Sequence, residues 1–168
     1  MLIAAKTQRW APEIVLRTFV EAEIAARDAS NAANRLRAAG FPATKTLDGF
    51  DVTASSIARQ SFDYLASLEW IDARENALVV GPAGTGKSHL LVALGHAAIA
   101  AGRRVRYFTA AELVETLYRA LADNSVGKVI ETLLRNDLLI LDLCRHRDYP
   151  DTRRERQVWA VSGRGLSG

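Results

Sequence analysis

The stretch Gly81-Pro-Ala-Gly-Thr-Gly-Lys-Ser88 decides the fold of this 168-residue chain. It fits the pattern G-x-x-x-x-G-K-[ST] in full, and it lies between a short apolar run, Ala77-Leu-Val-Val80, and a helical stretch that reaches about Ala101. Glycines let the backbone approach a polyphosphate closely, and successive N–H groups and the helix N-terminus then point at the anion. We therefore predict a phosphate-binding loop (P-loop, or Walker A motif). Its predicted cofactor-binding residues are Gly81, Pro82, Ala83, Gly84, Thr85, Gly86, Lys87 and Ser88.

The sequence also predicts which residues would face the metal ion of a bound nucleotide. In such a loop, Lys87 reaches the β and γ phosphates and the hydroxyl of Ser88 ligates Mg²⁺. The apolar run Leu138-Leu-Ile-Leu141 predicts a buried strand that ends at Asp142, whose carboxylate can hold Mg²⁺ through water across from Ser88. Four apolar residues before an Asp are common, so a purely structural Asp142 is the alternative. The predicted metal ligands are Ser88 and Asp142.

The residue after Asp142 bears on catalysis. An ATPase of this type usually has an acidic residue there, which orients and deprotonates the attacking water, but this chain has Leu143. Since phosphoryl transfer depends mostly on positioning and charge stabilisation, we expect nucleotide binding with severely slowed hydrolysis. We assign no catalytic residue, and the residues alone leave open whether the chain is an enzyme.

Strands and helices alternate along the second half of the chain. The run at 77–80 is typical of a strand that is buried on both faces of a parallel sheet. Val105-Arg-Tyr-Phe-Thr109 predicts a second strand, and Thr109 with Glu112 has the spacing of a capping box at the start of a helix. A short helix over 126–134 then precedes the strand at 138–141. This order predicts an α/β fold with a parallel sheet flanked by helices.

Helices also dominate the first half of the chain. The spacing of Leu16, Val20, Ile24 and Leu36 predicts a long amphipathic helix over 12–39, closed by Gly40. This helix either packs one stripe on a neighbour or forms an arm that contacts a partner or DNA. A connector over 43–53 and a helix from Ser55 or Ser56 to about Trp70 are expected to follow. The predicted domains are an N-terminal helical region and connector (1–53), a partial P-loop NTPase domain (54–142) and a divergent Arg-rich tail (143–168).

Composition excludes several classes of protein. The chain is 49% apolar and 24% charged, as expected for a soluble globular domain, and its longest apolar runs are far shorter than the roughly 20 residues of a membrane-spanning helix. The start of the chain lacks the pattern of a secretory signal, and the single cysteine, Cys144, allows no internal disulfide, so we expect a cytoplasmic protein without a membrane partner. The net charge of +3 arises entirely in residues 143–168.

Three other groups of residues are weighed for function. Arg103, Arg104 and Arg106 flank the second strand, where solubilising charges are favoured over DNA contacts. His89 and His96 have no partners at metal-ligand spacing and are interpreted as core or surface residues. Cys144, beside an arginine and a histidine, is interpreted as an unreactive thiol.

Segments along most of the first 142 residues resemble one family closely. They are Glu21–Ser30, Arg35-Leu-Arg37, Phe41–Asp51, Arg74-Glu-Asn76, Gly81–Leu90, Arg103–Leu113 and Asp137–Asp142. Together they resemble the IstB-like transposition helper ATPases, which are AAA+ proteins related to the DnaC helicase loaders. The P-loop is shared by many NTPases, whereas Phe41-Pro-Ala-Thr-Lys-Thr-Leu47 narrows the family.

The resemblance carries its own expectations. It implies ATP and Mg²⁺ as cofactors, ATP-dependent homo-oligomeric assembly on double-stranded DNA, and a transposase as partner. It places Gly81 and the residues from Gly84 to Ser88 in the phosphate loop, and it places Asp142 beside the Mg²⁺ ion. The alternatives are a non-enzymatic remnant or interaction module without stable nucleotide binding, and a helicase-loader role in DNA replication.

The resemblance implies that this AAA+ sheet is incomplete. Family members continue after the Asp142 position with an acidic residue, a sensor and an arginine finger, whereas residues 143–168 lack that pattern. In the family strand order 5-1-4-3-2, the fourth and fifth strands would be missing, which predicts unpaired edges. A strand at Gln157–Ser162 is the less favoured alternative. A frame-shifted or truncated gene copy is our hypothesis for this break, and it fails if no one-base shift in the locus restores the acidic residue and glycine.

Overall fold

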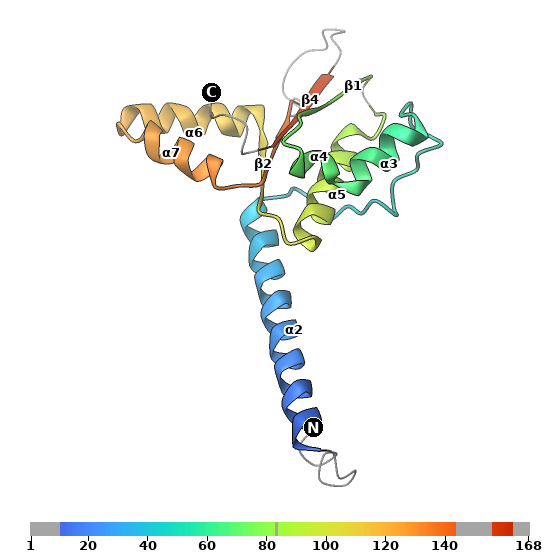
Figure 1. Cartoon of the computed structure of the whole chain (residues 1–168). Coiled ribbons are helices and arrows are strands. Elements are labelled where there is room, and N and C mark those ends of the chain that lie inside the picture. The colour runs from blue at the N-terminus through green and yellow to red at the C-terminus, as the bar shows by residue number, and fades with distance from the viewer. Residues whose placement is uncertain (1–10, 83, 144–155, 163–168) are drawn as a thin grey trace. The chain divides into compact units, whose positions relative to one another are not determined.

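The computed structural model describes residues 11–82, 84–143 and 156–162, the last of these as backbone only. Ala83 and Cys144 lie outside the described residues, as does most of the Arg-rich tail. The chain forms two compact units, which divide between Asn34 and Arg35. Figure 1 identifies each helix and strand along the chain.

Helix α2 (Pro12–Ala39) begins and ends where the sequence predicts. Side chains one helical turn apart form ion pairs on its surface, including Arg17 with Glu21 and Arg27 with Glu23. Gly40 follows the helix with a φ of 74°, a left-handed conformation that glycine adopts without strain. In the first unit the apolar side chains of Leu16, Val20 and Ile24 are exposed.

The predicted helix from Ser55 to Trp70 is wrong in its start and in its continuity. Helix α3 (Arg59–Ser67) begins after Ala58, without a side-chain cap, and α4 (Glu69–Asp72) is a separate turn. Leu68, at a φ of 61°, breaks the helix between them. The break turns Trp70 into the core, where it is 1% exposed and its indole Nε1–H donates to the carbonyl of Leu65 at 3.0 Å.

Four strands form one sheet in the order β1-β4-β3-β2. They are β1 (Ala77–Gly81), β2 (Val105–Thr109), β3 (Leu138–Asp142) and β4 (Arg156–Ser162). The strands β2 and β3 are parallel, and β4 runs antiparallel to both β1 and β3. The predicted parallel arrangement is therefore confirmed for β1, β2 and β3, which run in the same direction, and β4 adds an antiparallel strand between β1 and β3.

The strand β4 corrects the prediction of unpaired inner edges. It fills the place between the P-loop strand and the Asp142 strand, pairing Ala160 with Ala77 on one side and with Ile140 on the other. Backbone N–H and C=O groups that are left unpaired in a core are costly, so these two strands need a neighbour. The run Gln157-Val-Trp-Ala-Val161 is rich in β-forming residues.

The main core lies between the sheet and helix α5 (Lys87–Ala100). Alternate residues of β1 face this core, so Ala77 and Val79 pack against it. The intervening Leu78 and Val80 are 50% and 46% exposed, and the expectation that this strand is buried on both faces is wrong. The reason is position, because β1 is the last strand of the sheet in the described part of the chain.

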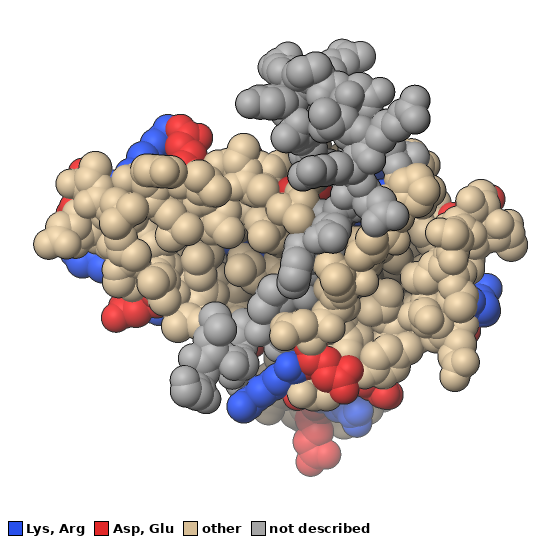
Figure 2. All heavy atoms as spheres, turned by 90° about the horizontal axis from the view of Figure 1, so that it is seen from above, with Lys and Arg blue, Asp and Glu red and all other residues tan. Residues whose placement is uncertain are grey.

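Helices α6 (Ala110–Ala122) and α7 (Val126–Leu134) pack together on the other side of the sheet from α3, α4 and α5 (Figure 1). The predicted capping box is confirmed, since the Thr109 hydroxyl accepts from the Glu112 N–H at 3.2 Å and the Thr109 N–H donates to Glu112 Oε2 at 2.8 Å. Uncharged residues cover most of the face seen in Figure 2, and basic and acidic side chains lie side by side at its margin.

Within the described ranges, no helix is long and apolar enough to span a membrane.

Candidate functional site

The P-loop lies where the sequence places it, between the end of β1 and the first turn of α5. Gly84 and Gly86 have φ angles of 83° and 82°, which side chains with a Cβ rarely adopt, so the loop depends on glycine at both positions. Gly86 directly precedes the helix. The N-terminus of α5 therefore borders the loop, and the positive end of a helix dipole attracts anions.

Lys87 is the central side chain of this loop. The residue is only 6% exposed, and its ammonium donates to the carbonyl of Pro82 and, at 3.4 Å, to the hydroxyl of Thr85. The Thr85 hydroxyl in turn donates to the same carbonyl at 2.9 Å. Among the described residues, no carboxylate forms an ion pair with Lys87. The hydrogen-bond partners of the ammonium in this part of the chain are thus neutral oxygens, which an anionic oxygen can replace with a gain in charge pairing.

The segment before α3 packs against the P-loop. The ring of Phe50 lies against Gly86 so closely that a Cβ added there would be 3.0 Å from Phe50 Cε2. The same ring stacks on Phe62 at 5.6 Å and meets the edge of His89 at 5.5 Å. The segment around Phe50 is itself held by Asp51, which accepts hydrogen bonds from Thr53 and the next N–H group.

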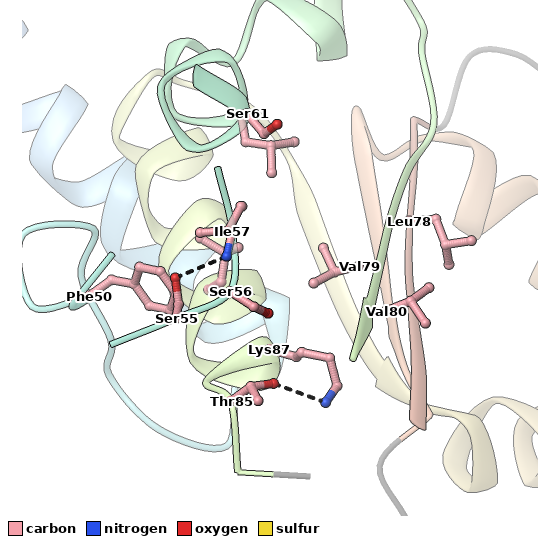
Figure 3. Close-up of a pocket in the computed structure, with 12 residues that line it drawn as sticks. Phe50, Ser55, Ser56, Ile57, Ser61, Leu78, Val79, Val80, Thr85 and Lys87 are labelled. Atoms are coloured by element: carbon pink, nitrogen blue, oxygen red, sulfur yellow. Dashed lines mark hydrogen bonds between the residues drawn. The ribbon is translucent and has the colours of Figure 1, made fainter. Parts of the chain in front are cut away.

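A cavity of about 220 Å³ adjoins the loop (Figure 3). One wall comes from the connector, with Phe50, Ser55 and Ile57, and the other from β1, with Val79. Lys87 and Thr85 lie at one end of it, and Figure 3 shows the dashed hydrogen bond between them. A ligand whose phosphates occupy the loop can therefore place the rest of its structure in this cavity.

Asp142 reaches the same edge of the sheet as the P-loop. It ends β3 and pairs with Val158 of β4, which pairs with Val79 just before the loop. Asp142 is 3% exposed, and the hydroxyl of Tyr107 donates to its Oδ2 at 2.9 Å. A buried carboxylate fixed by a hydrogen bond at the carboxyl end of a strand suits a cation carried by a bound phosphate.

Tyr107 and Phe50 are site residues that sequence reasoning missed. Tyr107 was expected only as part of a strand, because the register that brings it beside Asp142 arises from the pairing of β2 with β3. Phe50 belongs to a segment that was predicted as a connector. Its signal was a lone aromatic residue between Gly49 and Asp51, two turn-forming residues, which indicates a packed connector.

The other candidates have structural partners. Arg103 donates to Asp72 at 2.7 Å, Arg104 pairs with Asp137, and Arg106 donates to the carbonyl of Ala38 at the end of α2. His89 and His96 contact the aromatic rings of Phe50 and Phe41, respectively. Within the described part of the chain, no group of three or more potential ligands gathers at one place.

A P-loop between a strand and a helix, with a buried aspartate at the end of another strand of the same sheet, is typical of the P-loop nucleotide-binding proteins. Comparison with known families narrows this class. The model of the IstB-like ATP binding protein family matches residues 2–161, and the chain belongs to that family. The match continues past Asp142 into β4.

Individual relatives agree with the family model. A protein of insertion sequence IS5376 from Geobacillus stearothermophilus, named for ATP binding, is 36% identical over 74% of this chain. An insertion-sequence protein from Mycobacterium tuberculosis, also named for ATP binding, is 33% identical over 91% of the chain. The corresponding IS21 protein from Pseudomonas aeruginosa is 38% identical over 65%. The chain spans about half the length of these relatives, with 50%, 61% and 42% of each covered.

Proposed function

We propose that this chain binds Mg-ATP at the P-loop, hydrolyses it slowly, and acts in the transposition of an insertion sequence. The observation that carries the nucleotide part is Lys87, a buried ammonium whose partners are oxygens of its own loop. Triphosphate oxygens would replace the Pro82 carbonyl and the Thr85 hydroxyl around it. The first-turn N–H groups of α5 would bind the same anion.

The oxygen donors near the loop fit the magnesium ion that accompanies ATP. Ser88 lies in the first turn of α5, and Asp142 is a buried carboxylate at the same edge of the sheet. Hydroxyl and carboxylate oxygens are the donors that Mg²⁺ prefers, often with water between carboxylate and metal. In the proposed complex Ser88 would ligate the ion and Asp142 would hold water bound to it, and the ion would supply positive charge against the phosphates.

Slow hydrolysis is proposed because Leu143 follows Asp142. An apolar side chain there can neither orient nor deprotonate a water molecule. We expect the wild-type chain to release phosphate much more slowly than it binds ATP. We expect the Leu143→Glu variant to release phosphate faster than the wild type. Rapid phosphate release by the wild-type chain would contradict this part of the proposal.

The partners proposed for this chain are duplex DNA, a transposase and further copies of the chain. The support is membership of the IstB-like family and the insertion-sequence names of its relatives. The proposed role in transposition is that of one member of an assembly with these partners.

Titration calorimetry with Mg-ATP tests the nucleotide part. We expect saturable binding by the wild-type chain and its loss in Lys87→Ala, because the only buried ammonium among the described lysines is removed. Lys45→Ala is the matched control, since Lys45 is exposed and lies outside the loop. Its binding is expected to equal that of the wild type.

A thermal-shift measurement completes the test. A ligand at 100 times its dissociation constant stabilises the folded state by about 2.7 kcal/mol, so Mg-ATP should raise the Tm of the wild type and of Lys45→Ala but not of Lys87→Ala. A folded wild-type chain with neither heat of binding nor a shift in Tm would refute the nucleotide proposal and favour a non-enzymatic interaction module.

A further inference from the structure

A second hollow, of about 540 Å³, lies on the far side of the sheet from α5, between β2 and the helix pair α6–α7. Four basic side chains line it and, among the described residues, no acidic side chain does. They form two pairs: Arg104, just before β2, stands two residues from Arg106 on that strand, and Lys128 on α7 stands seven residues from Arg135, which directly follows that helix. Both spacings place a pair on one face of its element, so the fold brings the two pairs to opposite walls. We call this feature the basic hollow.

Two cations of the basic hollow, Lys128 and Arg135, differ from most arginines elsewhere on the surface. Arginines outside it are mostly neutralised by a carboxylate, as in Arg27 with Glu23 and Arg59 with Asp63. Among the described residues, neither Lys128 nor Arg135 forms an ion pair, and both are exposed. Their positive charge is therefore available to a partner.

Hydrogen bonds and ring contacts hold Arg104 and Arg106 in place. Asp137 accepts the backbone N–H of Arg104 at 2.9 Å and lies 3.8 Å from its guanidinium. Arg106 donates to the carbonyl of Ala38 and stacks its guanidinium 5.0 Å from the ring of Phe108. One wall of the basic hollow is thus ordered before any ligand arrives, which lowers the entropy cost of binding.

The chemistry of the lining selects the kind of partner. Beside the four cations lie the hydroxyls of Thr116 and Thr132 and the amide of Asn136, whose protons are donated to helix carbonyls. The cations therefore carry the recognition. Arginine and lysine are the side chains that neutralise the phosphates of nucleic acids.

We propose that the basic hollow is where this chain contacts the phosphodiester backbone of duplex DNA. The inference rests on the DNA part of the proposed function and assigns it to a surface separate from the P-loop. Lys128 and Arg135 contact phosphates directly, together with Arg104, and Arg106 keeps its partners in the wall. Such contacts carry no base information, so binding is independent of sequence.

Fluorescence anisotropy with two labelled duplexes of unrelated sequence tests the proposal, on the full chain with Mg-ATP over a series of salt concentrations. The variant is Lys128→Gln/Arg135→Gln, and Lys45→Gln/Arg74→Gln is a control with the same change in net charge at exposed sites outside the basic hollow. We expect the hollow variant to bind both duplexes about ten-fold more weakly, with the slope of log K against log salt reduced by about 2. The control is expected to retain the wild-type slope. Circular dichroism establishes that both variants are folded.

Each other result overturns the proposal in a distinguishable way. Equal weakening in both variants would mean that only net charge matters, and an unchanged hollow variant would place the DNA contact elsewhere. If poly-glutamate binding depends on Lys128 and Arg135 while duplex binding does not, the basic hollow serves an acidic protein partner. A wild-type chain that binds Mg-ATP but neither duplex refutes the DNA part of the proposed function as well.

Discussion

Gly95 in the middle of α5 allows a sharp test of how the helix that carries the P-loop is seated. A Cβ added at Gly95 would lie 2.5 Å from Phe41 Cζ and 2.9 Å from Ile140 Cδ1, both far inside normal contact. A Cβ added at Gly127, in the first turn of α7, would meet no atom within 4 Å. The same Gly→Ala substitution is therefore expected to have opposite effects at the two sites.

The expected magnitudes follow from two opposing terms. Replacing glycine by alanine inside a helix gains up to about 1 kcal/mol in helix propensity. At Gly95 this gain is outweighed, because Ile140 is fully buried and Phe41 stacks on His96 at 4.7 Å, so neither can move aside freely. Overpacking costs about 1–3 kcal/mol, and with two close side chains we take the upper end. Gly95→Ala should lose about 2 kcal/mol net, whereas Gly127→Ala should gain about 0.5 kcal/mol.

Urea unfolding followed by tryptophan fluorescence and circular dichroism measures both changes. At an m-value of about 2 kcal/mol/M, the loss in Gly95→Ala lowers the midpoint by about 1 M. The double variant Gly95→Ala/Phe41→Leu should cost less than the sum of its two single changes, since the smaller side chain makes room for the methyl group. If Gly95→Ala is as stable as Gly127→Ala, or if the two changes at Gly95 and Phe41 are additive, the close packing of α5 on β3 is refuted.

Three further predictions concern single hydrogen-bonded groups. Tyr107→Phe removes the hydroxyl that donates to buried Asp142 and is expected to cost about 1–3 kcal/mol in urea unfolding, and an unchanged midpoint would show that Asp142 does not depend on it. Thr109→Ala breaks the capping box of α6 and should lower the free energy of unfolding by about 1 kcal/mol. Thermal melting curves of the variant and the wild type that coincide would disprove this. The pKa of Asp51 is lowered by a threonine hydroxyl and two N–H groups, and that of Glu112 by the N–H and hydroxyl of Thr109. Since both pKa values are lower in the folded chain, their stabilisation is full above the ordinary carboxyl range and is lost as the pH falls through the lowered values, so urea midpoints that stay constant from pH 6 to pH 3 would contradict both assignments.

Elements with strong local signals could be predicted from the sequence. The helix over 12–39 has a proline at its start and a glycine after its end, and the capping box of Thr109 and Glu112 fixes the start of α6. The P-loop could also be predicted from neighbouring residues alone, because two of its glycines occupy positions with a left-handed backbone that other residues rarely adopt. These features depend on residues that are close together in the chain.

The features that could not be predicted depend on distant residues. The exposure of Leu78 and Val80 follows from the position of β1 at the end of the sheet, which no local pattern reveals. The hydrogen bond from Tyr107 to Asp142 depends on the register of two strands. The position of β4 depends on the unpaired backbone groups that its two neighbouring strands would otherwise have. The break at Leu68 is different, because a left-handed leucine costs free energy locally and persists only where packing such as that of Trp70 offsets the cost.

The position of β4 has a consequence for how the molecule is made. Among the described strands, the P-loop strand pairs with β4, which is synthesised after β1, β2 and β3, and the pairing of Ala77 with Ala160 closes a very long loop. Long-range pairings of this kind form slowly, so β1 waits without a neighbour while the chain emerges from the ribosome. A nascent chain that stops before Arg156 leaves the two halves of the candidate nucleotide site on strands that do not touch. Nucleotide added during synthesis should therefore protect the finished chain against protease, and leave chains that end before β4 as sensitive as they were.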